Sequence, residues 1–251
     1  MSNNNLLFGD SNAVVLVNES APEIAQFELG YNGSLPDQYG QTSFGLEGYI
    51  SPGGLTGNNI DSAFELLRSG TRADYEYVRL NAERDTRLPL EFSWILKLTA
   101  QLASDRLLPS EELGVGGYST VRGYDERAAN GDEGWIMSNE IRTPPASFFT
   151  LLPQRWKTRL NPAGDSASAS RARPDQMQLL GFWDYGVAHI LQAQPGEDAD
   201  VTLSSVGVGL RYMISPYLSV RFDYGWQLKS IADTATSSDD SRGHVAVLLS
   251  F

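Results

Sequence analysis

Cysteine is absent from this 251-residue chain, and histidine occurs only twice. The lack of cysteine excludes disulfide bonds, thiolate metal sites and cysteine nucleophiles. His189 and His244 fall in different predicted strands with no acidic residue at ligand spacing, so we expect no metal site. The sequence also lacks a G-x-x-x-x-G-K-[ST] phosphate loop and a G-x-S-x-G nucleophile motif, so we expect neither a cofactor nor an enzyme.

Long apolar runs and basic charge are scarce as well. No run of about eighteen consecutive apolar residues occurs, which excludes a transmembrane helix. The chain has 19 basic and 31 acidic residues, for a formal net charge of −12. This acidic balance argues against nucleic-acid binding, which depends on Lys and Arg. The first ten residues have neither a basic segment nor an apolar segment, so we see no export signal in the sequence as written.

The clearest pattern present is a strict alternation of apolar and polar residues. Between positions 90 and 102 every second residue is apolar. The same alternation occurs over 218–228 and over 243–251. Strands of soluble proteins are usually about five or six residues long, whereas strands that cross an outer membrane need about nine to eleven. Strands this long with two distinct faces therefore favour an antiparallel transmembrane β-barrel.

Weaker alternation completes a set of ten predicted strands. They span 13–17, 25–34, 42–51, 74–87, 90–102, 134–143, 176–191, 204–214, 218–228 and 243–251. The short connections at 87–89 and 215–216 suit periplasmic turns, and the long polar connections suit the cell surface. These long connections are 52–73, 104–133, 192–203 and 230–242.

The two acidic connections and the connection 144–175 differ from the others in composition. The acidic residues in two of the surface connections predict solvated loops, because no EF-hand ligand spacing is present. The connection 144–175 should be periplasmic, yet it is long and begins with an apolar stretch. That stretch either extends a strand or packs at the membrane rim, and the role of the segment stays open.

A motif in the connection 104–133 carries the functional signal. The segment from Gly114 reads Gly-Val-Gly-Gly-Tyr-Ser-Thr-Val-Arg-Gly-Tyr-Asp-Glu, and a Gly-Asp-x-Gly sequence and Asn139-Glu-Ile-Arg-Thr-Pro follow it. Val121-Arg122-Gly123-Tyr124 resembles the VRGY signature of the outer-membrane assembly and translocation superfamily. The flanking residues are similar to the ShlB/FhaC/HecB family, the transporters of two-partner secretion.

The resemblance implies a specific ion pair. In that family the VRGY loop folds back into the barrel lumen, and its arginine pairs with the aspartate of an F-x-D-x-G motif on a later strand. Phe182-Trp-Asp-Tyr-Gly matches that motif, so Arg122 is expected to pair with Asp184. The alternation of its strand also places Asp184 on the lumen side, since a lipid-facing carboxylate would be unfavourable. Glu140, which also faces inward, can offer a partner with suitable geometry. In a wet lumen the pair should be worth less than the roughly 3–5 kcal/mol of a fully buried one.

Three further residues are candidates for special roles. Gly116 and Gly117 precede the VRGY motif and are expected to be turn glycines that adopt positive φ. Phe251 ends an alternating strand, which is similar to the terminal signal that outer-membrane barrels present to the barrel-assembly machinery.

The resemblance also implies what lies outside the chain. Family members have a signal peptide, a plug helix, two POTRA domains and a sixteen-stranded barrel. We therefore expect residues 1–251 to be a C-terminal barrel part with about ten of sixteen strands, and 104–133 to be a loop folded into the lumen.

The function that the resemblance implies is the export, and activation by export, of a haemolysin- or adhesin-like exoprotein across the outer membrane. The expected partners are that exoprotein, outer-membrane lipid and the barrel-assembly machinery. The alternatives are an insertase of the same superfamily, a passive porin or surface adhesin, and a soluble β-sandwich that binds a ligand. The identity of the exoprotein and the oligomeric state stay open.

Overall fold

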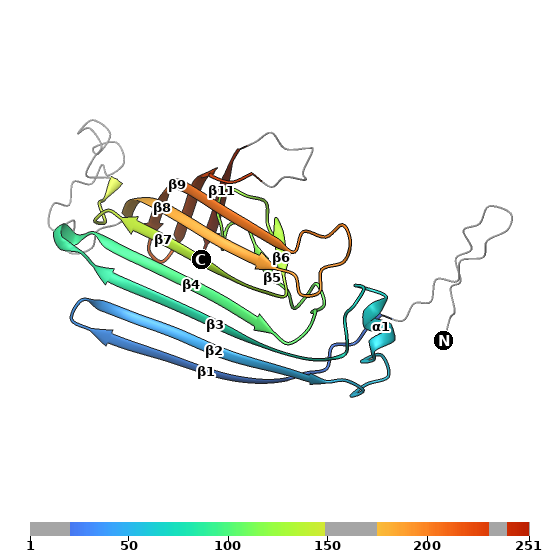
Figure 1. Ribbon diagram of the computed structural model, residues 1–251. Coiled ribbons are helices and arrows are strands. Elements are labelled where there is room, and N and C mark those ends of the chain that lie inside the picture. The colour runs from blue at the N-terminus through green and yellow to red at the C-terminus, as the bar shows by residue number, and fades with distance from the viewer. Residues whose placement is uncertain (1–20, 149–174, 231–239, 251) are drawn as a thin grey trace.

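The computed structural model describes residues 21–148, 175–230 and 240–250 of the chain. Nine of its strands form one antiparallel sheet in the order β1-β2-β3-β4-β7-β8-β9-β10-β11 (Figure 1). These strands are β1 (Phe27–Asp37), β2 (Gly40–Pro52), β3 (Asp74–Arg87), β4 (Ser93–Ala103), β7 (Glu133–Arg142), β8 (Gln176–His189), β9 (Asp200–Ile214), β10 (Leu218–Gln227) and β11 (Ser241–Leu249). The predicted antiparallel all-β fold is confirmed, and the tenth predicted strand, 13–17, lies outside the described residues.

The alternation of the sequence separates the two faces of the sheet. In the register of the strands, Trp135 on β7 lies next to Val187 on β8 and Ala100 on β4. Trp183 lies next to Val206, which lies next to Trp226. These side chains share one face, the outer face, where Trp183 and Trp226 are 42% and 45% exposed. Polar side chains dominate the other face, the inner face. A sheet with one exposed apolar face and one polar face is the arrangement that a membrane barrel strand requires.

The strand predicted to begin at Leu90 begins three residues later. Pro89–Glu91 form a short 3-10 turn, and Leu90 and Glu91 both have positive φ values near 60°. A residue in the left-handed region cannot continue an extended strand, and Pro89 has no N–H for the ladder. The apolar residue at position 90 is therefore part of the turn, although its spacing matches the alternation that follows.

The connections from β2 to β3, β4 to β7, β8 to β9 and β10 to β11 all start at the same end of the sheet, because neighbouring strands are antiparallel. Helix α1 (Asp61–Glu65) lies in the connection between β2 and β3. Residues 104–132, the inner loop, connect β4 to β7 and contain a small hairpin of β5 (Leu113–Val115) and β6 (Ala129–Gly131). This hairpin was not among the predicted strands. It lies within the curve of the sheet (Figure 1).

The inner loop covers one part of the inner face. Beneath it, buried apolar residues of the loop and of β7, β8 and β9 form a core. Its members are Leu113, Val115, Val121, Tyr124, Ala129, Ile136, Ala188 and Leu203. We call β7–β11 the packed half of the sheet.

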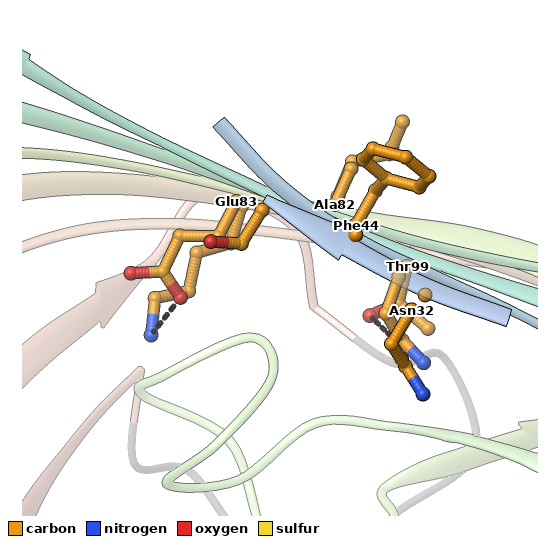
Figure 2. A pocket seen from close by; sticks show the side chains of 11 residues that line it. Asn32, Phe44, Ala82, Glu83 and Thr99 are labelled. Atoms are coloured by element: carbon orange, nitrogen blue, oxygen red, sulfur yellow. Dashed lines mark hydrogen bonds and ion pairs between the residues drawn. The ribbon is translucent and has the colours of Figure 1, made fainter. Parts of the chain in front are cut away.

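We call β1–β4 the open half. Its strands line a hollow of about 380 Å³ whose residues include Asn32, Glu83 and Thr99. Figure 2 shows these three side chains on one side of the strands, with Phe44 and Ala82 on the other. Polar groups on the inner side pair with each other: Lys97 Nζ lies 3.3 Å from Glu83 Oε2.

The order of strands ends at β1 and β11, so the barrel is not closed within the described residues. In that part of the chain, no helix is long and apolar enough to cross a membrane.

Candidate functional site

The site is built around Arg122, at the far end of the hairpin in the inner loop. Arg122 Nε donates to Asp184 Oδ2 at 2.7 Å, and Arg122 Nη2 donates to Asp184 Oδ1 at 2.9 Å. The backbone N–H of Arg122 also donates to Asp184 Oδ2, at 3.1 Å. This two-pronged contact matches the planar geometry of guanidinium and carboxylate. It ties the inner loop to the middle of β8.

The same guanidinium reaches two further carboxylates and an aromatic ring. Arg122 Nη1 donates to Glu140 Oε2 on β7 at 2.8 Å and to Asp223 Oδ1 on β10 at 3.4 Å. The guanidinium carbon lies 3.5 Å from the centre of the Phe182 ring. Arg122 therefore joins three strands of the packed half with one side chain.

The ion pair of Arg122 and Asp184 is buried. The two side chains are 3% and 0% exposed. The expectation of a wet pair is corrected here, because both side chains are buried and the Phe182 ring stacks on the guanidinium. Removing one partner of a buried pair leaves an uncompensated charge, which costs about 3–5 kcal/mol.

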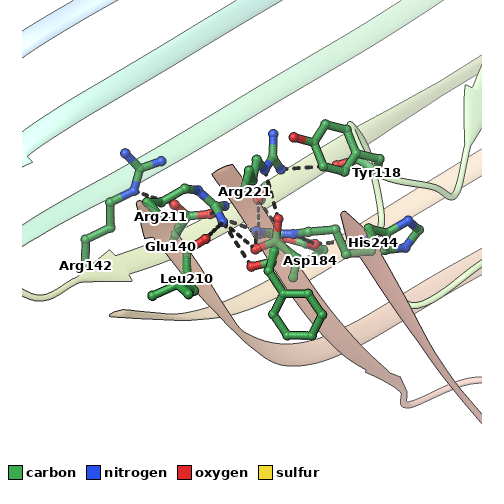
Figure 3. Close-up of polar contacts among 12 residues, drawn as sticks. Tyr118, Glu140, Arg142, Asp184, Leu210, Arg211, Arg221 and His244 are labelled. Carbon is green, nitrogen blue, oxygen red and sulfur yellow. Dashed lines mark hydrogen bonds and ion pairs between the residues drawn. The ribbon is translucent and has the colours of Figure 1, made fainter. Parts of the chain in front are cut away.

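Three other arginines complete the cluster (Figure 3). Arg142 and Arg211 contact Glu140 at 2.5 and 3.4 Å. Arg211 and Arg221 contact Asp223 at 2.9 and 2.8 Å. Four guanidinium groups thus face three carboxylates, which leaves one net positive charge in the cluster.

The electrostatic state of Arg122 follows from these contacts. Burial alone would lower the pKa of Arg122, yet the hydrogen bonds and charges of Asp184 and Glu140 raise that pKa above its ordinary value. The guanidinium therefore stays charged at every physiological pH.

Glycine permits the close approach of the loop to β10. Gly123 has φ of +93°, and a Cβ there would lie 3.0 Å from the backbone of Gly225. A Cβ on Gly225 would lie 2.8 Å from Gly123 N. Both positions therefore need glycine, one for its φ and both for space. Gln227 Nε2 donates to Gly123 O at 2.7 Å, and Gly123 N donates to His244 Nε2 at 3.3 Å.

The remaining motif residues are buried around Arg122. Tyr124 is 1% exposed, and its hydroxyl lies 2.8 Å from Ser204 O and 2.5 Å from Lys229 O. Val121 is fully buried in the core beneath the loop. The side chains of the Val121–Tyr124 motif thus hold the loop through apolar packing, an ion pair and a hydrogen bond.

The other predicted residues lie elsewhere. Gly116 and Gly117 have φ of +106° and +108° and lie in the turn region after β5. Phe251 lies outside the described residues.

Sequence reasoning missed several members of the cluster. Phe182 and Gly225 were not recognised as partners of the loop, and Arg211 and Asp223 were not recognised as members of the cluster. A signal was available: Phe222-Asp-Tyr-Gly on β10 partly repeats the Phe182-Trp-Asp-Tyr-Gly of β8. In both segments an inner-face aspartate is followed two residues later by a glycine that makes room for the loop.

The chain was compared with known proteins. A model of the family described as haemolysin secretion/activation protein ShlB/FhaC/HecB matches residues 13–212. No curated protein matches the chain. Among solved structures, CdiB from Escherichia coli is similar, with a TM-score of 0.66 and 18% identity.

The likeness to CdiB and the match to the family model cover different shares of the proteins. The likeness to CdiB covers 93% of this chain but only 38% of the CdiB chain, and at this identity it shows the fold. The family model covers most of the chain, including the inner loop and its partners on β7 and β8. This chain therefore belongs to the ShlB/FhaC/HecB family.

Proposed function

We propose that this chain forms part of an outer-membrane pore that exports a haemolysin- or adhesin-like exoprotein from the periplasm to the cell surface. One observation carries the proposal: the family match includes the Val121–Tyr124 motif, and this motif is buried against the inner face of a two-faced sheet. A loop held inside the curve by buried charges can occupy a pore and be displaced from it. The chain spans 38% of the CdiB chain, so the activity belongs to a longer assembly.

The outer face supports the location in the outer membrane. Large apolar side chains are exposed along that face in both halves, including Leu29, Leu46, Trp135, Trp183 and Val245. In water such a surface would favour aggregation, whereas lipid satisfies it. We propose that this face contacts outer-membrane lipid and that the long connections lie at the cell surface. The barrel-assembly machinery is the proposed partner during biogenesis.

Export needs no nucleotide in this proposal. The inner face offers charged and polar groups, which keep a passing polypeptide hydrated, and we infer that folding of the exoprotein outside the cell drives transport. The family name includes activation, and we infer that this means folding of the exoprotein during export rather than chemistry by this chain.

An insertase that assembles other barrels is the second candidate, because the Val121–Tyr124 motif is shared by the superfamily that contains both activities. The two are separated by removing the native gene and measuring all outer-membrane and secreted proteins. Loss of one exoprotein from the medium, with other barrels unchanged, is the result we expect. Loss of many barrels would overturn the export proposal in favour of the insertase.

A passive porin is the third candidate and gives a different result. A porin would show high and steady conductance in planar bilayers, and its removal would leave the secreted proteins unchanged. The export proposal instead requires that the motif loop restrict the pore at rest.

A further inference from the structure

A second ion-pair cluster lies at the base of the inner loop, away from Arg122. Its centre is Asp132, whose side chain is 0% exposed. Arg68, from the connection between β2 and β3, donates to Asp132 Oδ1 at 2.5 Å and to Oδ2 at 3.3 Å. The backbone N–H groups of Leu107 and Leu191 each donate to this carboxylate at 2.8 Å. One carboxylate thus receives donors from three separate connections.

Arg68 is held on the inner loop by more than Asp132. Its Nη1 donates to the carbonyl oxygen of Leu107 at 2.6 Å and lies 2.8 Å from Glu112 Oε1. Burial raises the pKa of Glu112 above its ordinary value, and the neighbouring charge of Asp132 adds to the effect that Arg68 opposes. Arg68, which lies in the connection between β2 and β3 of the open half, is therefore enclosed by the inner loop.

A second arginine extends the cluster to the connection between β8 and β9. The Arg106 side chain is 0% exposed and contacts Glu197 with two nitrogens, at 2.9 and 2.8 Å. Arg106 also donates to the carbonyl oxygens of Leu191 and Gln192 at 3.2 and 3.0 Å. A buried arginine that binds two carbonyls and a carboxylate is a specific tie between two connections.

We propose that Arg68, Arg106, Asp132 and Glu197 form an outer latch, a set of positioning residues that holds the long connections together over one end of the sheet. The inference rests on the proposed export function. The inner loop is then fixed at two places, by Arg122 at its tip and by Asp132 at its base. Displacement of the loop requires release of both.

The latch also joins the two halves of the sheet. Arg68 follows α1 in the connection between β2 and β3, whereas Asp132 directly precedes β7. A closed latch ties the connection between β2 and β3 to the inner loop, in addition to the hydrogen-bonded ladder that joins β4 to β7. Opening the latch would release the inner loop from the connection between β2 and β3, at the end of the sheet where α1 lies (Figure 1).

The experiment uses the native transporter in its outer membrane and replaces Asp132 by Asn. An Asn side chain keeps one acceptor oxygen, but it carries no charge for Arg68 and offers an N–H where Leu191 needs an acceptor. The matched control is Asp74→Asn, at the same end of the sheet, where the Asp74 and Arg72 side chains are 50% and 56% exposed. Glu197→Gln is a second variant that tests the latch at its more exposed member.

Two readouts distinguish a latch from a structural role. Trypsin added to intact cells should cleave after Arg106 about tenfold faster in Asp132→Asn than in the wild type, because loss of a charge-assisted contact releases the connection. The open fraction in planar bilayers should rise by a similar factor. Glu197→Gln should show a smaller rise, and Asp74→Asn should show none.

The latch proposal is overturned if assembled Asp132→Asn and Glu197→Gln keep the wild-type cleavage pattern and open fraction. If Asp132→Asn fails to assemble, the cleavage rate and open fraction of Glu197→Gln decide. A rise in both supports the latch, and wild-type values overturn it. Failure of the export proposal is seen separately: removal of the gene would then leave the secreted exoproteins unchanged, while trypsin cleavage and the open fraction still report on the latch.

Discussion

The packed and open halves of the sheet share one outer face but differ on the inner face. In the packed half, Asp184 and Asp223 are fully buried and bind arginines from the inner loop and from β9 and β10. In the open half, the Glu83 and Lys97 side chains are 49% and 55% exposed and bind only each other among the ion pairs of the described residues. The inner loop reaches the open half near the end where α1 lies, where Tyr77 donates to Glu111 at 2.7 Å.

The difference between the halves comes from small residues rather than from charge. Both inner faces carry polar side chains, so alternation alone does not decide which one binds the loop. The packed half has glycines where the loop approaches: a Cβ on Gly186 would lie 2.5 Å from Val115, and one on Gly225 would lie 2.9 Å from the backbone of Arg122. These glycines allow the loop to come close enough for its charges to be buried, and buried charges are the ones that must be paired.

The largest expected effect is that of Arg122→Ala, which removes the main difference between the halves. Asp184 and Glu140 would lose their shared partner and stay buried, at a cost of about 3–5 kcal/mol to the docked position of the loop. We expect a barrel that still assembles but exports at least about tenfold less exoprotein. The measurement is the amount of exoprotein in the medium against the amount of assembled transporter.

The control for this variant is Arg72→Ala, which removes an exposed ion pair with Asp74. An exposed pair is worth about 0–1 kcal/mol, so this change should leave export intact. Normal export by Arg122→Ala would show that the buried pair has no part in transport.

A smaller effect is expected from adding one methyl group to the inner face of each half. In Gly225→Ala the new Cβ would collide with the backbone of Gly123, at 2.8 Å, which should destabilise the docked loop by about 1–3 kcal/mol. In Gly30→Ala the nearest atom is Glu47 Cγ at 3.8 Å, so the change should be neutral or slightly stabilising. Thermal unfolding of the two variants in detergent measures the difference. Equal effects of the two substitutions would contradict the explanation that the glycines of the packed half make room for the inner loop.

The strands and faces were predictable because they depend on local alternation. Nine of the ten predicted strands are present, and Trp135 and Ile141 lie exposed on the outer face. The errors occur where backbone geometry overrides the pattern, as at Leu90, whose positive φ makes the strand begin three residues later than predicted. The hairpin of β5 and β6 is three residues long on each side, which is too short for periodicity to register.

The candidate site was only partly predictable, and the reason is physical. The placement of Arg122 near Asp184 follows from a motif and from the side on which an inner-face aspartate must lie. The contact of Arg122 with Asp223 and the fit of Gly225 depend on how far the loop descends along β10, which no local pattern encodes. Asp132 was read only as part of a flanking motif, because its donors come from connections far away in sequence.

The smallest expected effect concerns the pH dependence of the ion pair between Arg106 and Glu197 in the outer latch. The hydrogen bonds from Arg106 lower the pKa of Glu197 from 4.5 to about 2. A carboxyl whose pKa is lowered in the closed state stabilises that state above pH 4.5, and the contribution is lost as the pH falls from 4.5 to about 2. In planar bilayers, the difference in open fraction between the wild type and Glu197→Gln should therefore stay constant from about pH 7 to about pH 5 and vanish near pH 2.

Asp74→Asn, measured in parallel, corrects for the titration of exposed carboxylates. A difference that disappeared already between about pH 7 and about pH 5 would show that Arg106 does not hold the Glu197 carboxylate. The outer end would then be closed by Asp132 and Arg68 alone.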